Sequence, residues 1–244
     1  MAAPSVRRVF LVDDPVRLST AGAPAVDVAI ALTEALAKAG SRISDVAVVA
    51  WSTPVTETGS RAHPRSAWLA AGGPVDTVTF PLRAVEDGSL EALVVASQTV
   101  ASHSAELALA VITAADGTTT MAQVASERYL VQSTRCGAFG LGPWIVAGWD
   151  EDQIVEGAYE AIVRWCVLNT VDSDTLGAVG LRTIGPFDAE HLARRLRIDT
   201  GRVVISDDLA GALAGIRATD ANGPRVLCES TAAGQCAAVA VAVS

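Results

Sequence analysis

The chain has 244 residues, of which half are hydrophobic and only 5% aromatic, a length that suits one large domain. Its 18 Lys and Arg residues against 27 Asp and Glu residues give a formal net charge of −9. Nucleic-acid-binding domains normally carry a basic surplus, so this composition argues against a nucleic-acid partner.

Nothing in the sequence predicts a membrane span or an export signal. The nearest apolar run, 232–243, is shorter than the roughly 18 residues that a spanning helix needs. Residues 1–4 lack the charged-then-apolar pattern of a signal peptide. The four cysteines have neither CxxC spacing nor a His nearby in sequence, which argues against a zinc site and a disulfide framework. We therefore expect a cytoplasmic protein with reduced thiols, no metal and no cofactor.

The first half of the chain alternates helical and apolar-strand patterns. Helices are predicted over 25–39, 65–71 and 86–102, and strands over 6–12, 45–51, 75–80, 107–114 and 121–132, the last of these as one strand or two. Gly40 is placed to end the first helix, and Asp116-Gly117 indicates a turn.

The same order recurs in the second half, after a glycine-rich segment over 133–149 that reads as irregular. Helices are predicted over 151–168, 188–196 and 207–218, and strands over 176–184, 202–206, 225–228 and 235–243. Asp188 is expected to cap the second of these helices, and Ser206 or Asp207 the third.

Each half therefore reads helix, strand, helix, strand, helix, strand, strand. This pattern predicts one domain over 1–244, built from pseudo-repeat halves of about 1–132 and 133–244. Alternating helices and apolar strands favour an α/β fold with a mixed, largely parallel sheet covered on both faces. Two such halves can pack in a five-layer αβαβα arrangement; the alternative is one doubly wound sheet.

The segment 85–93 has the pattern of a sharp turn that follows a strand and opens a helix, which is how many α/β enzymes present a nucleophile. Here the turn carries Glu86 and Asp87, with no Cys or Ser at the expected place. Carboxylates at a helix start are favoured by capping and by the helix dipole alone. Alternatively, burial would raise the pKa of Glu86 and make it a general acid or base.

The duplicated pattern resembles the thiolase-like superfamily, which includes thiolases and β-ketoacyl synthases. The helix over 25–39 with the following residues 43–49 is similar to the family's first long helix and its exit into a strand. Residues 86–96 are similar to the ketosynthase nucleophile turn, in which Cys and small residues precede Leu-x-Ala-Leu-x-x-Ala. Residues 225–228, followed by Ala233-Gly234-Gln235, resemble the closing strand pair. The resemblance implies a thiolase-like five-layer fold with a compact second half.

The resemblance also implies where a ketosynthase would carry its catalytic residues. The nucleophilic Cys, whose pKa a helix N-terminus lowers, corresponds to Glu86. The two positions that bind the thioester carbonyl, normally His and then His or Asn, fall near Arg182 or Thr183 and near Gly211 or Ala212. None of these residues is Cys, His or Asn, so Claisen chemistry has no catalyst among them.

This profile resembles the chain length factor, the non-catalytic partner subunit of a ketosynthase heterodimer. It implies a protein without independent activity that pairs with a catalytic β-ketoacyl synthase, and works with an acyl carrier protein, in polyketide or fatty-acid biosynthesis. Family members join two sheets across a dimer through the strand that corresponds to 75–80; the alternative is an ordinary interior strand. Two other functions stay open: a re-purposed enzyme that acts on an acyl thioester with Glu86 as acid or base, and a homodimeric acyl- or carrier-binding protein without chemistry.

A basic cluster on this acidic protein could dock an acidic acyl carrier protein, or could be a solvated helix face. It consists of Arg194, Arg195 and Arg197. The three histidines lie far apart in sequence, and we expect no catalytic role for them: His63, His103 and His191. Among the cysteines, Cys136 is in a loop-like stretch and could be reactive or simply buried, whereas we expect core positions for the others: Cys166, Cys228 and Cys236.

Overall fold

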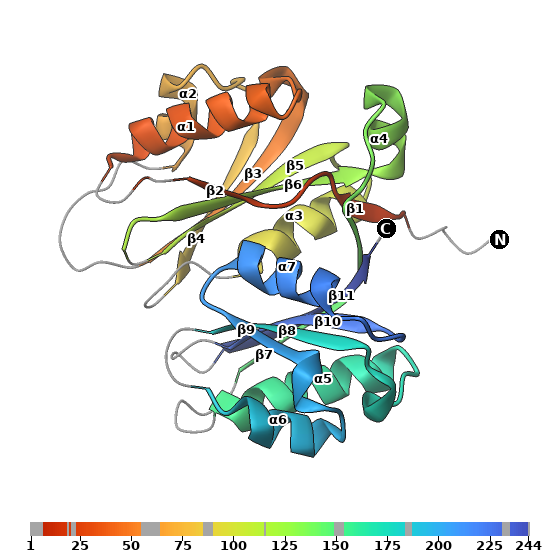
Figure 1. Cartoon of the computed structure of the whole chain (residues 1–244). Coiled ribbons are helices and arrows are strands. Elements are labelled where there is room, and N and C mark those ends of the chain that lie inside the picture. The colour runs from red at the N-terminus through yellow and green to blue at the C-terminus, as the bar shows by residue number, and fades with distance from the viewer. Residues whose placement is uncertain are drawn as a thin grey trace. The chain divides into compact units, whose positions relative to one another are not determined.

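The computed structural model describes residues 7–18, 20, 23–54, 64–84, 90–114, 116–148, 154–183, 187–230 and 235–243. The chain forms two compact units, unit 1 over Met1–Ala138 and unit 2 over Phe139–Ser244, and the break falls later than the position near 132 that the sequence pattern indicates (Figure 1). Within the described residues, no helix is both long enough and apolar enough to cross a membrane.

Unit 1 is built on a mixed sheet with the strand order β4-β3-β5-β6-β1. Its strands are β1 (Val9–Leu11), β2 (Val16–Leu18), β3 (Val46–Pro54), β4 (Val78–Ala84), β5 (Leu107–Thr113) and β6 (Thr119–Ser126). The central strand β3 runs parallel to β4 and to β5, whereas β6 is antiparallel to β5, β1 and β2. Apolar side chains fill β3 and β5 almost completely, as expected of strands that are buried on both faces.

Helices cover both faces of this sheet (Figure 1). They are α1 (Ala25–Lys38), α2 (Pro64–Ala70) and α3 (Glu91–Ala101), with α4 (Glu127–Ser133) after the last strand and a 3₁₀ turn, η1 (Ile43–Asp45), before β3. The α1 and α2 side is closed by large buried residues that include Leu32, Leu36, Trp51 and Trp68. At the end of α1, Gly40 has a φ of 73°, a value that favours glycine, so the predicted helix stop is confirmed.

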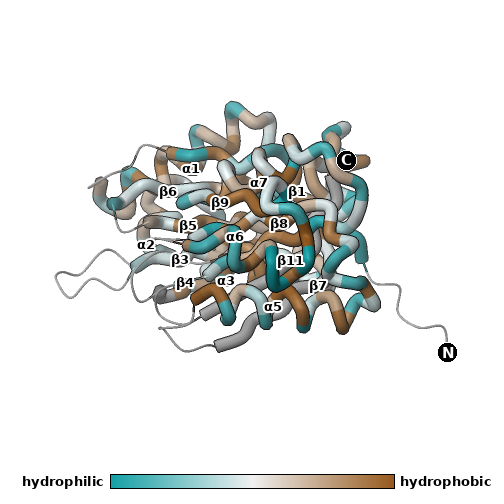
Figure 2. Tube along the Cα trace, turned by 60° about the horizontal axis from the view of Figure 1, so that its bottom comes forward, coloured by the Kyte–Doolittle hydropathy of each residue, from teal (hydrophilic) through white to brown (hydrophobic). Residues whose placement is uncertain are grey.

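Unit 2 has a sheet with the order β7-β11-β10-β8-β9. Its strands are β7 (Phe139–Gly148), β8 (Ala178–Thr183), β9 (Val203–Ser206), β10 (Arg225–Ser230) and β11 (Gln235–Val243). Helices α5 (Ile154–Leu168) and α6 (Ala189–Leu196) lie on one face and α7 (Leu209–Ala218) on the other, with 3₁₀ turns η3 (Ser173–Thr175) and η4 (Thr200–Arg202) between elements (Figure 1). In Figure 2, β8 is largely coloured as hydrophobic, whereas α6 is largely hydrophilic.

The two sheets have the same topology. If β2 is set aside, each unit places its third, second, fourth, fifth and first strands in that spatial order. In both, the second strand is parallel to the third and fourth, and the fifth is antiparallel to the fourth. The first strand is antiparallel to the fifth in each unit. The duplicated architecture that the sequence predicts is therefore confirmed.

Two predicted segments are wrong. The segment 133–149, expected to be irregular, contains β7. Gly142 and Pro143 lie where the register between β7 and β11 shifts, and the residues on either side of them pair with β11. The second part of the strand predicted over 121–132 is α4, which starts where the Ser126 hydroxyl accepts a hydrogen bond from the backbone N–H of Tyr129.

The helix starts are partly as predicted. The side chain of Asp188 caps α6 by accepting the backbone N–H of His191 at 2.8 Å, as expected. Helix α7 is capped by Asp208 rather than by Ser206 or Asp207, and the Asp208 carboxylate accepts the N–H of Gly211 at 2.6 Å. Helix α3 begins at Glu91, and residues 85–89 before it lie outside the described part of the chain.

Candidate functional site

The carboxyl ends of parallel strands are where open α/β sheets bind ligands. In unit 2, the parallel strands β8, β9 and β10 end at Thr183, Ser206 and Ser230. Polar residues gather at these ends, although the strands before them are mostly apolar. We therefore take this edge of unit 2, where the three parallel strands end, as the candidate site.

A buried ion pair joins the two central strands at this edge. Arg182 is next to last in β8 and Glu229 next to last in β10, and the two residues are direct partners in the parallel register. The Arg182 Nη1 donates to the Glu229 Oε1, and each side chain is only 3% exposed. On the other side of Arg182, its register partner is Ser206 of β9. A row of three polar residues thus crosses the three parallel strands.

This row lies on the face of the sheet that α7 covers. Side chains alternate along a strand, so Arg182 shares a face with Gly180. A Cβ on Gly180 would stand 2.5 Å from Ile216 Cδ1 and 3.0 Å from the backbone oxygen of Ala212, both in α7. The Ser206 hydroxyl accepts the N–H of Asp208, the cap of the same helix, at 3.2 Å. The ion pair is therefore covered by the start of α7.

The last residues of β8 and β10 point to the opposite face. Thr183 and Ser230 are register partners, and both are buried. The Ser230 hydroxyl donates to the backbone oxygen of Ile154 at 3.3 Å, which ties the end of β10 to the start of α5. The start of α5 is thereby fixed at the same edge of the sheet.

The residues at the expected carbonyl-binding positions are engaged in contacts within the fold. Arg182 is engaged by Glu229, and Ala212 is fully buried in the packing between α7 and the sheet. The N–H of Gly211 is taken up by the cap of α7. The predicted nucleophile position, Glu86, and its neighbour Asp87 lie outside the described residues.

Glu229 was missed by sequence reasoning. Its partner lies 47 residues away, so the pair is invisible to any local pattern. The available signal is a charge at the next-to-last position of a mostly apolar strand, which occurs both in 178–183 and in 225–230, with opposite signs. Two such opposite charges in one repeat predict a cross-strand pair once the strand order is known.

Two of the three cysteines whose side chains the structure describes are buried. Burial, with a smaller contribution from the nearby Asp172 carboxylate, raises the pKa of the Cys166 thiol to about 11. Cys228 is buried in β10, and its thiol lies 3.7 Å from the Glu229 backbone oxygen. The core positions predicted for these two are confirmed, and Cys136 is exposed rather than buried. The side chain of Cys236 lies outside the described part of the structure.

The histidines have surroundings of different kinds. His103 follows α3 with a φ of 62° and is exposed. His191 in α6 places its Nε2 3.2 Å from the Glu156 Oε1 of α5. His63 lies outside the described residues. Across the described part of the chain, no group of three or more His, Cys, Asp or Glu residues could hold a metal ion.

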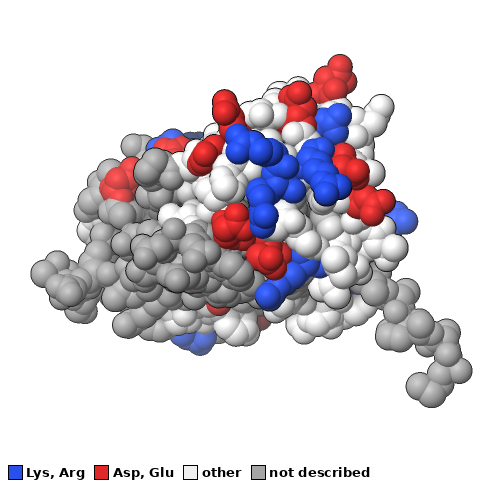
Figure 3. Space-filling view, turned by 90° about the horizontal axis from the view of Figure 1, so that it is seen from below, with Lys and Arg blue, Asp and Glu red and all other residues white. Residues whose placement is uncertain are grey.

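One arginine of the basic cluster on α6 is held by its neighbours. Arg195 donates to the Glu156 Oε2 at 2.7 Å and lies over the Tyr159 ring, 4.2 Å from its centroid. Arg194 and Arg197 are exposed. Figure 3 shows that acidic side chains flank the Lys and Arg side chains on the face seen from below. Docking of a carrier protein there stays a prediction that depends mainly on Arg194 and Arg197.

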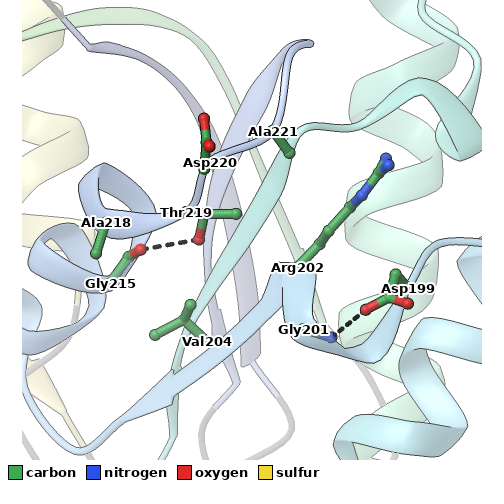
Figure 4. Close-up of a pocket in the computed structure, with 9 residues that line it drawn as sticks. All are labelled: Asp199, Gly201, Arg202, Val204, Gly215, Ala218, Thr219, Asp220 and Ala221. Carbon is green, nitrogen blue, oxygen red and sulfur yellow. Dashed lines mark hydrogen bonds between the residues drawn. The ribbon is translucent and has the colours of Figure 1, made fainter.

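A surface groove of about 630 Å³ lies at the opposite edge of unit 2, where β9 begins (Figure 4). Its lining residues are Asp199, Gly201, Arg202, Val204, Gly215, Ala218, Thr219, Asp220 and Ala221. Several of its polar groups bond within the fold: Asp199 accepts the Gly201 N–H at 2.8 Å, and the Thr219 hydroxyl donates to the Gly215 oxygen at 2.9 Å. Arg202 donates to the Leu176 oxygen at 3.1 Å. These polar groups therefore stabilise the fold around the groove, and we do not choose the groove as the candidate site.

No family model matches the chain, and no curated protein matches it by sequence. Solved structures do match. Human mitochondrial 3-ketoacyl-CoA thiolase has a TM-score of 0.76 at 12% identity, over 98% of this chain and 99% of that chain. A thiolase from Ascaris suum in complex with coenzyme A has a TM-score of 0.77 at 11% identity, over 98% and 100% of the two chains.

Peroxisomal 3-ketoacyl-CoA thiolase of Saccharomyces cerevisiae matches with a TM-score of 0.75 at 13% identity, over 97% of this chain and 98% of that chain. That enzyme is described as a five-layered α-β-α-β-α structure built from two core domains of identical topology. The shared strand order of units 1 and 2 is the same kind of duplication. The chain therefore has the thiolase fold, as its sequence pattern predicts.

Proposed function

We propose that the chain is a non-catalytic, ketosynthase-like subunit that pairs with an active β-ketoacyl synthase in polyketide or fatty-acid biosynthesis. The observation that carries this proposal is the open edge of the unit 1 sheet. Strand β4 is the outermost strand and pairs on one side with β3. Among the strands of the described residues, β4 therefore lies at the edge of the sheet and not in its interior.

The first half of the edge strand exposes apolar side chains, whereas Pro81 and Arg83 follow in its second half. Val78 and Phe80 share one face of β4 and are 47% and 39% exposed, and Val75 just before the strand is also exposed. An exposed hydrophobic edge strand is a template for pairing with another strand, and proteins normally protect it with charge or cover it. A second sheet of the same fold would bury these side chains and extend the hydrogen-bonded ladder, except at Pro81, which has no N–H to donate.

The absence of catalysis in this proposal follows from the site residues. Arg182 is already paired with Glu229, and Ala212 has only a methyl group to offer. A thioester carbonyl gains its reactivity from hydrogen-bond donors aimed at the developing oxyanion. The active partner would supply those donors and the nucleophile, and an acyl carrier protein would dock through the basic cluster of Arg194 and Arg195 in α6 and Arg197 just after it.

Co-expression of the chain with a ketosynthase encoded beside it tests the proposal. We expect the two chains to purify together and to give the mass of a one-to-one complex by native mass spectrometry. The isolated chain should show no condensation activity, whereas the complex should. The proposal would be contradicted if the chain is monodisperse and forms no complex with any ketosynthase encoded beside it. A mass equal to two identical chains would favour a homodimeric binding protein.

A second candidate is acyl-thioester chemistry by this chain alone. It is favoured by the fold match to catalytic thiolases, among them one solved with coenzyme A. Glu86 would then act as the general base or acid. Turnover of an acyl-CoA by the isolated chain, lost in Glu86→Gln while the circular dichroism spectrum is unchanged, would establish this function in place of the first.

A further inference from the structure

Strand β9 is the outermost strand of the unit 2 sheet. Among the described residues it stands at the end of the strand order, with β8 as its parallel neighbour on one side. Proteins commonly protect such an edge with charged side chains or proline, as Pro81 and Arg83 do in β4. The four residues of β9, Val203–Ser206, include neither a charge nor a proline. The outer side of β9 is therefore suited to pairing with a further strand.

Apolar side chains lie on both faces of β9. Val203 packs against the core cluster of α5 and α6, and Ile205, two residues on and thus on the same face, is 40% exposed. On the other face Val204 lies close to α7, where a Cβ on Gly215 would stand 2.1 Å from the Val204 Cγ1 (Figure 4). A strand added to the outer side would cover Ile205 and extend both apolar faces.

Charges at the two ends of β9 indicate which strand fits. Arg202 directly precedes β9, and the exposed Asp207 directly follows it. An antiparallel second copy of β9 brings the Asp207 end of one strand beside the Arg202 end of the other, at both ends of the contact. A parallel copy would place like charges together, which is destabilising. Charge complementarity therefore favours a second copy of this chain in the antiparallel direction.

Symmetry restricts the register of such a pair. Residues directly opposite each other in an antiparallel pair share a face of the sheet, so a two-fold axis must pass through a residue. An axis at Ile205 would place Val203 opposite the Asp207 of the second copy. An axis at Val204 instead places Val204 opposite its own copy and Val203 opposite the Ile205 of the second copy. Pairs of β-branched apolar side chains stabilise a sheet, so the axis at Val204 is favoured.

We infer that two copies of this chain associate through their β9 strands, antiparallel and centred on Val204. The two unit 2 sheets then become one continuous sheet. This contact is independent of the proposed function, which uses β4 of unit 1, so one chain can bind a ketosynthase and a copy of itself at the same time. Because β9 has only four residues, the contact is small and the association is reversible and concentration-dependent.

Disulfide cross-linking of the full chain tests the register. The variant is Val204→Cys in a Cys136→Ser background, because Cys136 is exposed. Opposite Cα atoms of an antiparallel pair lie about 4.5–5.5 Å apart, within the range that a disulfide can bridge. The control is Val131→Cys in the same background, at a residue of α4 that is 75% exposed.

We expect mild oxidation to convert the Val204→Cys chain into a covalent dimer on non-reducing gels. This should be about tenfold faster or more than for Val131→Cys, because a disulfide needs Cα atoms within about 7 Å of each other. The Cys136→Ser chain alone gives the background from the remaining cysteines. The inference is overturned if Val204→Cys cross-links no faster than the control.

Sedimentation velocity over a range of protein concentrations tests the charges. Asp207→Arg should weaken self-association about tenfold, equivalent to about 1.4 kcal/mol, because cations then meet at both ends of the contact. Arg202→Asp/Asp207→Arg should restore it, since exchanging both charges recreates the opposite pairs. Arg202 also donates to the Leu176 oxygen, so circular dichroism checks that the double variant folds; if it does not, the cross-link decides.

Val78→Lys/Phe80→Lys separates this contact from one through β4. This variant should self-associate as the wild type does. The inference is overturned if the wild type stays monomeric at the highest concentration reached, as it would if β9 pairs with a strand of another protein. It is also overturned if self-association is lost in the β4 variant but kept in Asp207→Arg. The proposed function keeps its separate test, the mass of the co-expressed pair.

Discussion

Arg182 illustrates how much a single buried charge can cost once its partner is removed. Truncation in Arg182→Ala would remove the ion-pair partner of the Glu229 carboxylate, which stays buried beneath α7. Breaking a buried pair in this way typically costs about 3–5 kcal/mol of unfolding free energy. We expect a loss of that size in urea unfolding monitored by tryptophan fluorescence.

The matched variant for this prediction is Arg182→Met/Glu229→Leu, in which both charges disappear together. Its unfolding free energy should lie close to that of the wild type, because an apolar pair needs no compensation. Equal losses of unfolding free energy in the single and double variants would contradict the explanation that the buried Glu229 charge, once Arg182 is removed, is the main cost.

Glu106 gives unit 1 a pH-dependent contribution to stability. A hydrogen bond from the Arg7 guanidinium holds the pKa of this carboxyl below its usual value; burial opposes the shift, and the Ser126 hydroxyl bond adds to it. The folded state therefore favours the ionised form. Its stabilisation is fully present above the unfolded pKa of about 4.3, and is lost as pH falls through the lower, folded pKa.

We expect the stability advantage of the wild type over Glu106→Gln to be constant from neutral pH to about pH 5 and to shrink below that. Denaturant unfolding of both proteins at a series of pH values between 7 and 3 measures it. The side chain is 39% exposed, so water screens the pair and the difference should be modest. A difference in unfolding free energy between the two proteins that grows as the pH falls would contradict the prediction.

At the residue scale, the sequence predicted the strand ends at the candidate site better than the contacts between them. Arg182 and Thr183 could be placed at the end of a strand because the apolar run before them is clear. The pairing of Arg182 with Glu229 could not, because it depends on β10 lying beside β8 across a long stretch of chain. Local patterns carry no information about such partners.

At the element scale, prediction succeeded where burial set a clear period. The strand β5 and the first four residues of β8 are apolar runs, and α1 has a regular apolar face. Prediction failed at β7, where three glycines and a proline are typical of a loop, and at α4, where Tyr129 and Leu130 belong to a second short apolar run after Ser126. In both segments long-range pairing or a single cap decides the structure, and neither has a periodic signature.

The close contact between α7 and β8 requires a glycine at position 180, where any Cβ would meet the helix. Gly180 → Ala would place a Cβ 2.5 Å from Ile216 Cδ1 and 2.7 Å from its Cγ1. Because Ile216 is fully buried, the helix or the strand must move, and such overpacking costs about 1–3 kcal/mol. We expect a loss in this range in denaturant unfolding of Gly180→Ala.

The second variant for this contact is Gly180→Ala/Ile216→Ala, which removes both clashing atoms. Each single change should destabilise the protein, the first by overpacking and the second by leaving a cavity. In the double variant the new methyl group fills part of that cavity, so its loss should be smaller than the two single losses together. Simple additivity would show that the clash is relieved elsewhere.

At the scale of the whole molecule, the repeated order of elements revealed the duplication, although the halves share little sequence. The order alone leaves the spatial arrangement of strands open, since several topologies accommodate the same alternation. The spatial arrangement follows from the pairing of β3 and β8, each of which has a parallel neighbouring strand on both sides. Only the paired strands reveal that both units follow one plan, and that β4 is left at an edge.

That edge gives the last prediction. The variant Val78→Lys/Phe80→Lys adds two charges to the exposed face of β4, the device by which natural edge strands avoid pairing. If this edge joins the chain to a ketosynthase, burying two lysines would remove the complex, while the isolated chain, whose core these residues do not complete, should stay folded. Native mass spectrometry of the co-expressed pair measures the loss.

The control is Val131→Lys, at an apolar residue of α4 that is 75% exposed and lies away from β4 in unit 1. It adds charge at a more accessible position of unit 1, so it should leave the complex intact. If both variants lose the complex, general charge rather than the strand edge controls assembly. If both keep it, the subunits meet elsewhere, because two lysines cannot be buried in a sheet-to-sheet contact without a cost of several kcal/mol per charge.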